Sequence, residues 1–290
     1  MNVPFEWLIG WRYTRAGRAA RRNGFISFIS GVSVLGIALG VAALIIVLSV
    51  MNGFQKEVRD RMLSVVSHIE LYNAGGAALE DWQALAKQAS LNPAVVGAAP
   101  FVPAQALIAR GDDMRGAMVR GIVPALEAQV TPLAASQRET FAKLQPGQWG
   151  VLIGIELAQS LGVQVGDPLT IVAPGGQMTP AGVVPRLKQV TVVGIFNAGH
   201  YEYDSGLALM HADDAAKLFR TGGITGVQLR LKDAQLARSV GEQLASQLGY
   251  GVIVRDWTRT NRNWFDAVQV EKRMMFIILT LIVAVAAFNL

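Results

Sequence analysis

The residue types best suited to chemistry gather in one short stretch, NAGHYEYDSG, which runs from Asn197 to Gly206. His200, Glu202 and Asp204 occupy alternate positions in it, so in an extended strand their side chains would share one face. An imidazole beside two carboxylates can bind a transition metal or serve as a general acid and base. This stretch is therefore the place where a catalytic or metal site would be sought first.

Two features of the sequence favour a structured turn in that stretch instead. Gly199 and Gly206 bracket the three residues, and aromatic residues alternate with them. A metal site also needs three or four ligands and groups that orient them, and the other histidines, His68 and His211, stand at no ligand spacing. We expect no catalytic residue and no metal ligand, and keep a metalloenzyme built on the cluster as an alternative.

Signatures of nucleotide use and of nucleophilic catalysis are also missing from the sequence. It holds no GxxxxGK[ST] loop that would cradle phosphates, so any ATP hydrolysis would belong to another chain. The serine in GIELAQSLGV, residues 154–163, lacks the Gly-x-Ser-x-Gly setting of a nucleophile elbow and fits a helix face better. We expect a protein that is not an enzyme and that binds no cofactor of its own.

The composition indicates a membrane protein. Hydrophobic residues make up 52% of the 290, and only 16% are charged, against about 25% in a typical soluble domain. No charge occurs from Asn23 to Gln55, and Phe25–Val50 is an apolar run longer than the ~20 residues that a bilayer core requires. We predict a transmembrane helix over residues 25–50. Residues 274–290 predict the start of a second such helix, in which we expect the chain to be truncated.

The net charge of +5 lies almost wholly before the first apolar run. Residues 1–24 hold five arginines against one glutamate, whereas Met51–Glu271 holds nineteen basic and twenty acidic residues. This asymmetry indicates that the basic residues flank a membrane span and do not form a surface that binds nucleic acid. By the positive-inside rule it keeps the N-terminus in the cytoplasm and sends residues 51–273 across. A cleaved signal peptide is the alternative, but the run is longer than an apolar core of ~7–15 residues and no small-residue cleavage site follows it.

Between the two apolar runs the sequence has the pattern of a compact α+β domain with one or two lobes. It contains no cysteine, so the exported part would rely on its apolar core and not on disulfides. Apolar spacing and glycine caps predict helices over Leu79–Ser90, from Ile155 to a cap at Gly162, and from Gln235 to a cap at Gly249. Predicted strands include His68–Tyr72, Val227–Lys232 and Val252–Asp256.

Three segments carry a family resemblance: Ile29–Leu63 (ISGVSVLGIALGVAALIIVLSVMNGFQKEVRDRML), Val192–His211 (VVGIFNAGHYEYDSGLALMH) and Glu271–Leu290 (EKRMMFIILTLIVAVAAFNL). They resemble the LolC/LolE family of lipoprotein-releasing ABC transporter permeases. The resemblance implies a membrane protein in which transmembrane helices flank a periplasmic α+β domain, a MacB-like permease architecture. It also implies four transmembrane helices in all, so the third, the fourth and the loop that grips the ATPase would lie beyond Leu290.

In LolC-type members of that family, a β-hairpin called the hook reaches out and binds LolA, the soluble periplasmic carrier. The matching stretch here is Pro174–Pro185, between strand-like Pro168–Ala173 and Lys188–Phe196. Its three prolines lack a backbone donor, so we expect a loop that neither folds away nor pairs as an edge strand. A turn buried against its own domain is the alternative. The carrier-binding residues implied are Pro174, Met178, Pro180, Val183, Val184 and Pro185.

The family pattern and the sequence of the first apolar run point to further residues. A basic patch beside the hook belongs to the family pattern, and Arg186 and Lys188 are its nearest candidates. Gly36 and Gly40 form a Gly-x-x-x-Gly pair, which permits close packing of transmembrane helices. Residues 1–24 mix tryptophans and arginines, as an interfacial helix on the cytoplasmic surface does.

The resemblance therefore implies a transport subunit of the inner membrane that releases lipoproteins bound for the outer membrane and passes them to the carrier. Its expected partners are a LolD-type cytoplasmic ATPase that holds ATP and Mg²⁺, a second permease subunit (another copy or a LolE-type chain), a LolA-type carrier, the lipoprotein and membrane lipid. A MacB- or FtsX-like subunit for efflux or hydrolase activation is the alternative within this architecture. A membrane-anchored periplasmic metalloenzyme is the alternative outside it.

Overall fold

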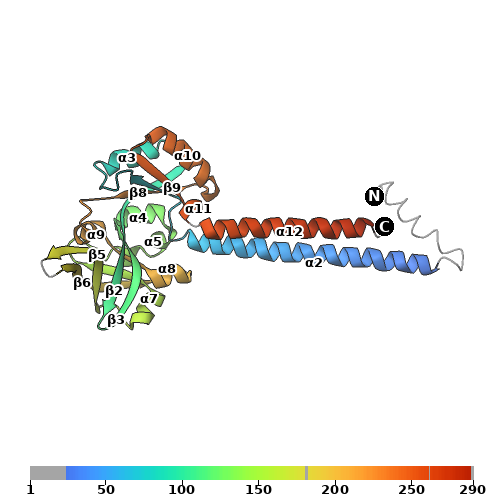
Figure 1. The fold of residues 1–290 in the computed structure, drawn as a ribbon, viewed down its shortest axis with the longest axis horizontal. Coiled ribbons are helices and arrows are strands. Elements are labelled where there is room, and N and C mark those ends of the chain that lie inside the picture. Colours follow the sequence, from blue (N-terminus) through green and yellow to red (C-terminus); the bar gives the residue numbers. More distant parts are fainter. Residues whose placement is uncertain (1–23, 180–181, 261, 289–290) are drawn as a thin grey trace. The chain divides into compact units, whose positions relative to one another are not determined.

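The computed structural model describes residues 24–179, 182–260 and 262–288. Figure 1 shows their fold. The chain divides into two compact units, one made of residues 1–56 and 263–290 and the other of residues 57–262. The predicted interfacial segment, residues 1–24, lies outside the described residues apart from Gly24.

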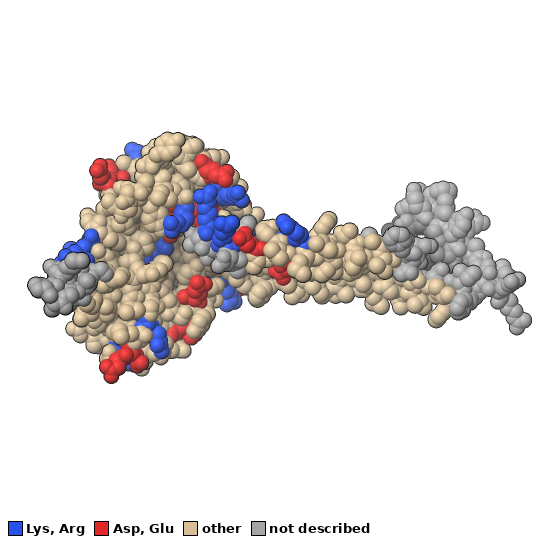
Figure 2. Space-filling model, in the orientation of Figure 1, with Lys and Arg blue, Asp and Glu red and all other residues tan. Residues whose placement is uncertain are grey.

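The first unit contains the two apolar helices, α2 (Gly24–Met62) and α12 (Arg262–Phe288). They lie side by side in Figure 1, and Gln55 Nε2 donates a 2.7 Å hydrogen bond to Glu271 Oε2 between them. Figure 2 shows uncharged surface along most of their length. Gly31–Met62 is the one stretch in the described part of the chain long and apolar enough to cross a membrane, and its most apolar window, of mean hydropathy 2.8, is wholly unburied. A helix that exposes so much apolar surface suits a lipid solvent.

Helix α2 continues twelve residues beyond the predicted end of the span at Val50. The added turns are polar, and an ion pair of 2.8 Å joins Arg61 Nε to Glu57 Oε1 one turn away. Such i,i+4 pairs stabilise an exposed helix in water. The helix thus outlasts the apolar run because a second, polar sequence continues it.

The second unit is built on nine strands in the described residues, six of which close into a ring. The ring runs β2–β3–β7–β4–β6–β5 and returns to β2, because β2 pairs with both β3 and β5. Gly111, at φ +59°, lies in the tight turn that joins β2 to β3. The ring strands are β2 (Val95–Arg110), β3 (Asp113–Ile122), β4 (Gly150–Gly154), β5 (Pro168–Thr179), β6 (Gly182–Phe196) and β7 (Leu207–His211).

Alternate residues of all six strands point into this barrel and form its core. Helices α7 (Ile155–Leu161) and α9 (Ala212–Phe219) add apolar side chains to the same cluster. A strand with every second residue buried has a fixed register, since a slip of one residue would turn its apolar face outward. Core residues of the strands include Val102, Ile108, Val119, Ile153, Ile171, Val192 and Met210.

The first half of β2 leaves the barrel and enters a second lobe. There it pairs with β8 (Gly226–Leu231), followed by β1 (Ile69–Asn73) and β9 (Val252–Asp256), all antiparallel. Helices α3 (Trp82–Ala89) and α10 (Ala237–Leu248) contact these strands. The shared strand β2 makes the second unit one body with two lobes.

Four short helices cover the barrel strands from outside. They are α4 (Pro124–Val130), α5 (Pro132–Ser136), α6 (Arg138–Phe141) and α8 (Tyr201–Gly206). Phe141 and Leu144 pack there against outward residues of the barrel, such as Leu152 and Leu209. The predicted strand Val252–Asp256 is confirmed residue for residue, and the predicted cap Gly162 closes α7 at φ +61°. The predicted helix from Gln235 is split into a 3₁₀ turn and α10.

Candidate functional site

The predicted hook is a β-hairpin formed by the ends of β5 and β6. Beyond the barrel the backbone pairs again, with Gln177 opposite Val184 and Thr179 opposite Gly182. The expectation that its prolines prevent strand pairing is therefore wrong. The ladder is interrupted only between Ala173 and Gln177, where Pro174 and the two glycines after it stand opposite Pro185. Two residues without an N–H face each other at this irregularity, which explains why the ladder breaks there and resumes further on.

The tip of the hairpin bears most of the predicted carrier-binding residues. Pro180 lies outside the described residues, and so do the side chains of Met178, Val183 and Val184. At the base, Pro174 and Pro185 are both exposed. The role of these six residues in binding a carrier stays a prediction.

The two candidates for a basic patch contact their own domain. Arg186 Nη1 donates to the carbonyl oxygen of Leu218 at 3.2 Å, and Lys188 Nζ lies 3.9 Å from the centre of the Trp149 ring. A cation over an aromatic face is stabilised but keeps its charge. Both side chains are half-buried on strand β6, two residues apart, so they share one face of it.

The cluster around His200 is a helical turn and not the strand in which its side chains would share a face. Residues Tyr201–Gly206 form α8, and the buried Asp204 accepts hydrogen bonds from the backbone N–H groups of Ala198, at 2.7 Å, and His200, at 3.2 Å. Glu202 is exposed. Within the described residues, no group of three or more His, Asp or Glu side chains is placed to hold a metal ion. The Asp204 carboxylate holds the turn together.

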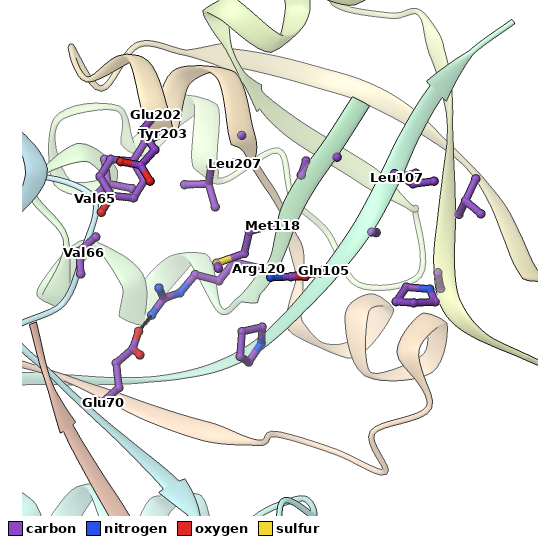
Figure 3. Close-up of a pocket in the computed structure, with 18 of the residues that line it drawn as sticks. Val65, Val66, Glu70, Gln105, Leu107, Met118, Arg120, Glu202, Tyr203 and Leu207 are labelled. Atoms are coloured by element: carbon purple, nitrogen blue, oxygen red, sulfur yellow. Dashed lines mark hydrogen bonds and ion pairs between the residues drawn. The ribbon is translucent and has the colours of Figure 1, made fainter. Parts of the chain in front are cut away.

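A cavity of about 1020 Å³ lies in the second unit. Its walls come from the β2–β3 ribbon, from helix α8, from β1 and β9 of the second lobe, and from the hairpin base. Figure 3 shows Leu107 and Met118 on the ribbon, with Tyr203 and Leu207 on another wall. Pro174 and Pro185 also line it, so the predicted hook begins at this cavity.

One end of the cavity carries a buried polar network centred on Arg120, which is 8% exposed. Its Nη2 donates to Glu70 Oε1 at 2.9 Å, as Figure 3 shows, and to Gln228 Oε1 at 2.7 Å. Tyr72 donates to the other oxygen of Glu70 at 2.7 Å, and Gln228 donates to Glu127. The chain of bonds joins the barrel, through β3, to the second lobe, through β1 and β8.

The electrostatics of this network follow from burial. Burial alone would lower the pKa of Arg120, but the carboxylates of Glu70 and Glu127 outweigh it and raise that pKa. Burial raises the pKa of Glu127, against the effect of Arg120, and also raises that of Tyr72, with Glu70 adding to it. On the α8 wall, burial raises the pKa of Tyr203 to about 12. At neutral pH the Arg120 cation is thus balanced inside the protein, and both phenols are neutral.

The glycine pair of the first span lies beside the second apolar helix. Gly36 and Gly40 border a groove of about 360 Å³ together with Leu281 and Val285 of α12. A Cβ built on either glycine would meet no atom within 4 Å. The close approach of another transmembrane helix at these glycines remains a prediction.

The residues of the Arg120 network are difficult to recognise in the sequence. The signal available was weak: Glu70 and Arg120 are isolated charges inside apolar strand segments, IELYN and GAMVRGI. A single charge in a strand predicts an outward position unless its partner is known. That partner is 50 residues away in the chain.

The comparison with family models defines the class first. Residues 30–247 match the model for the MacB-like periplasmic core domain. The periplasmic region of MacB from Actinobacillus actinomycetemcomitans aligns over 69% of this chain and 94% of that one, at 11% identity and a TM-score of 0.38. The matched domain and the apolar helix define a permease of MacB-like architecture.

Sequence relatives then identify the family. The lipoprotein-releasing system transmembrane protein LolC of Neisseria meningitidis is 47% identical over 288 residues, which cover 98% of this chain and 68% of that protein. LolC of Xylella fastidiosa strain Temecula1 is 46% identical over all of this chain and 69% of its own length. The chain belongs to the LolC/LolE family of lipoprotein-releasing permeases. It is an inner-membrane protein with a periplasmic domain.

Proposed function

We propose that this chain is a permease subunit that releases outer-membrane-destined lipoproteins from the inner membrane and passes them to a LolA-type periplasmic carrier. Its membership in the LolC/LolE family carries the proposal. A LolD-type ATPase in the cytoplasm supplies the energy and holds ATP and Mg²⁺, because this sequence has no phosphate-cradling loop. A second permease subunit, another copy or a LolE-type chain, completes the membrane part.

In this proposal the hairpin is the contact with the carrier. A two-stranded arm anchored in a barrel, with an uncharged sequence from Pro174 to Pro185, suits insertion into an apolar partner. Methionine adapts to irregular apolar surfaces because its side chain is unbranched and polarisable. Arg186 and Lys188 at the base add positive charge for an acidic rim.

Release is tested with a chimera in which this chain replaces the matching 288-residue segment of the Neisseria LolC. The chimera is expressed in cells depleted of their own LolC, and outer-membrane lipoproteins are followed by membrane fractionation. We expect them to reach the outer membrane. Retention in the inner membrane, with chimera present in normal amount by immunoblot, would contradict the proposal.

Orientation is tested separately with a reporter that is active only outside the cytoplasm. The arginines before the first span predict activity after fusion at Gly75 and none after fusion at Arg22. Activity at Arg22 would overturn the proposed multi-pass arrangement with a cytoplasmic N-terminus.

A further inference from the structure

The large cavity of the second unit is bounded by an apolar strip on the outer face of the barrel. Strand register aligns Gly116, Leu107, Val172 and Leu187 across four neighbouring strands, β3, β2, β5 and β6. Directly paired residues share one face of a sheet, and this face is opposite the barrel core. Leu107 is 44% exposed and Leu187 is 64% exposed. The domain therefore leaves a connected apolar surface uncovered, and the first three of these residues line the cavity.

Gly116 adds a second observation. It lies inside strand β3, its φ is not positive, and a Cβ built on it would meet no atom within 4 Å. Neither backbone conformation nor internal packing thus calls for glycine at this position. Glycine in a strand interior weakens the strand, and it often marks a place where a ligand approaches closely.

The charges on the cavity wall select the kind of ligand. Arg120 and Arg255 contribute two positive charges, Glu70 and Glu202 two negative ones, and the sum is zero. Glu70 accepts bonds from both Arg120 and Tyr72, so its carboxylate is already paired within the protein, whereas the buried Nε–H of Arg120 has no acceptor among the described residues. An anionic lipid headgroup would find no unbalanced cation here, whereas an uncharged chain with ester or amide carbonyls would cost no charge burial.

The position of the cavity selects the source of that chain. Its wall includes Pro174 and Pro185 at the base of the hairpin, and Val65, which follows helix α2 by only three residues. Its volume of about 1020 Å³ is at the upper end of the ~300–1,000 Å³ usual for ligand pockets. An apolar chain seated there lies next to the arm proposed to meet the carrier.

We propose that this cavity binds an acyl chain of the lipoprotein substrate within the periplasmic domain, before that chain passes to the carrier. The inference rests on the proposed function and deepens it, since it adds an acyl-chain site in the globular domain. Leu107, Val172 and Met118 form its apolar wall, and Gly116 leaves room for the chain against the strand.

The test uses the full chain in nanodiscs of phosphatidylethanolamine and phosphatidylglycerol. The probe is a synthetic triacylated cysteinyl peptide with a diazirine in one acyl chain, and mass spectrometry locates the photolabelled residues. We expect labelling on the β2–β3 wall. Met118→Glu should lower it at least about tenfold, because a carboxylate would enter the apolar wall. Gly116→Phe should lower it by filling the space.

Met114→Glu is the matched control, since Met114 is an exposed methionine of the same strand that does not line the cavity. It should leave labelling within about twofold of the unmodified chain. Thermal unfolding of each variant shows whether it is folded. Equal loss in both glutamate variants would overturn the inference.

Three other results would also overturn it. Labelling confined to α2 or the hairpin would remove the cavity site. Equal labelling by a diazirine phosphatidylethanolamine would identify bulk lipid as the occupant, and cross-linked dimers through the cavity wall would identify a second copy of the chain. The chimera assay separates these failures from failure of the proposed function. Normal release with Met118→Glu would reject the cavity alone, whereas no release by the unmodified chimera would reject the permease role.

Discussion

The base of the hairpin and the Arg120 network line the same cavity, yet they differ in how they are built. The hairpin is a local structure, in which paired residues such as Thr179 and Gly182 are three positions apart in the chain. The network joins Arg120 to Glu70 and Gln228, which are 50 and 108 positions away. One region should therefore tolerate changes without loss of fold, and the other should not. A hairpin for binding and a buried polar network for stability can therefore border one cavity and still respond independently to mutation.

The largest expected effect tests the Arg120 network. Arg120→Ala leaves Glu70 and Gln228 without their buried donor, and loss of one partner of a buried pair costs about 3–5 kcal/mol of unfolding free energy. Denaturant unfolding of the purified full chain in detergent measures it.

Arg115→Ala on the same strand is the control for that measurement, because Arg115 is exposed and bonds only to the neighbouring Met114 carbonyl among the described contacts. It should change stability by less than about 0.5 kcal/mol. If the two alanine variants unfold alike, the network does not hold the lobes together.

The next effect tests the role of the hairpin in binding the carrier. Removing the Met178 side chain beyond Cβ should weaken carrier binding by about 1–3 kcal/mol, at ~25 cal/mol per Å² of apolar surface buried. That corresponds to roughly a five- to hundredfold loss in affinity. Met178→Asp should abolish capture of the carrier and leave the melting temperature of the chain nearly unchanged.

Met114→Asp is the control for Met178→Asp, since Met114 is an exposed methionine that lies on β3 and not on the hairpin. It should retain the carrier. Early melting of Met178→Asp would instead indicate a buried turn, because a carboxylate in a core is destabilising unless it is paired.

A smaller effect sharpens the picture of the network. Tyr72→Phe removes only the hydroxyl that donates to Glu70 Oε2 at 2.7 Å. A hydrogen bond to a charged group contributes about 1.5–3 kcal/mol, so the loss should be well below that of Arg120→Ala. Tyr250→Phe, at a fully exposed tyrosine, should have no measurable effect on unfolding. If Tyr72→Phe lowers the free energy of unfolding as much as Arg120→Ala does, the Tyr72 hydroxyl, and not the Arg120 guanidinium, is the main stabilising group of the network.

A further effect depends on pH and belongs to the second lobe. Burial, with a contribution from Arg230, lowers the pKa of His68 from 6.5 to about 4, and its Nδ1 accepts a bond from the N–H of Leu231. The unfolded chain therefore binds the proton first, so stability should fall as pH decreases from about 6.5 to 4. His68→Gln should flatten this part of the stability profile, measured by melting temperature against pH. An unchanged slope would assign the acid sensitivity to other groups.

How far the sequence predicts the molecule can be judged from single elements. Strand β9 and the Gly162 cap follow from local signals, alternation in one and a left-handed glycine in the other. The pairing of β5 with β6 beyond the prolines did not follow, because proline removes donors only at its own positions and leaves its neighbours free to pair. The structured turn predicted around His200 is helix α8, but the Asp204 hydrogen bonds that hold it were not predicted, because they depend on the folded geometry of the turn.

By itself the sequence determined the apolar helix before residue 62, the α+β alternation and the absence of cysteine, because hydropathy and period act locally along the chain. Only the tertiary structure decided that six strands close into a barrel, that β2 serves two lobes, and that Arg120 meets Glu70 beside a cavity. These features depend on contacts between residues far apart in the chain. Strand order and ion-pair partners are fixed by which surfaces pack together, and no local pattern encodes that choice.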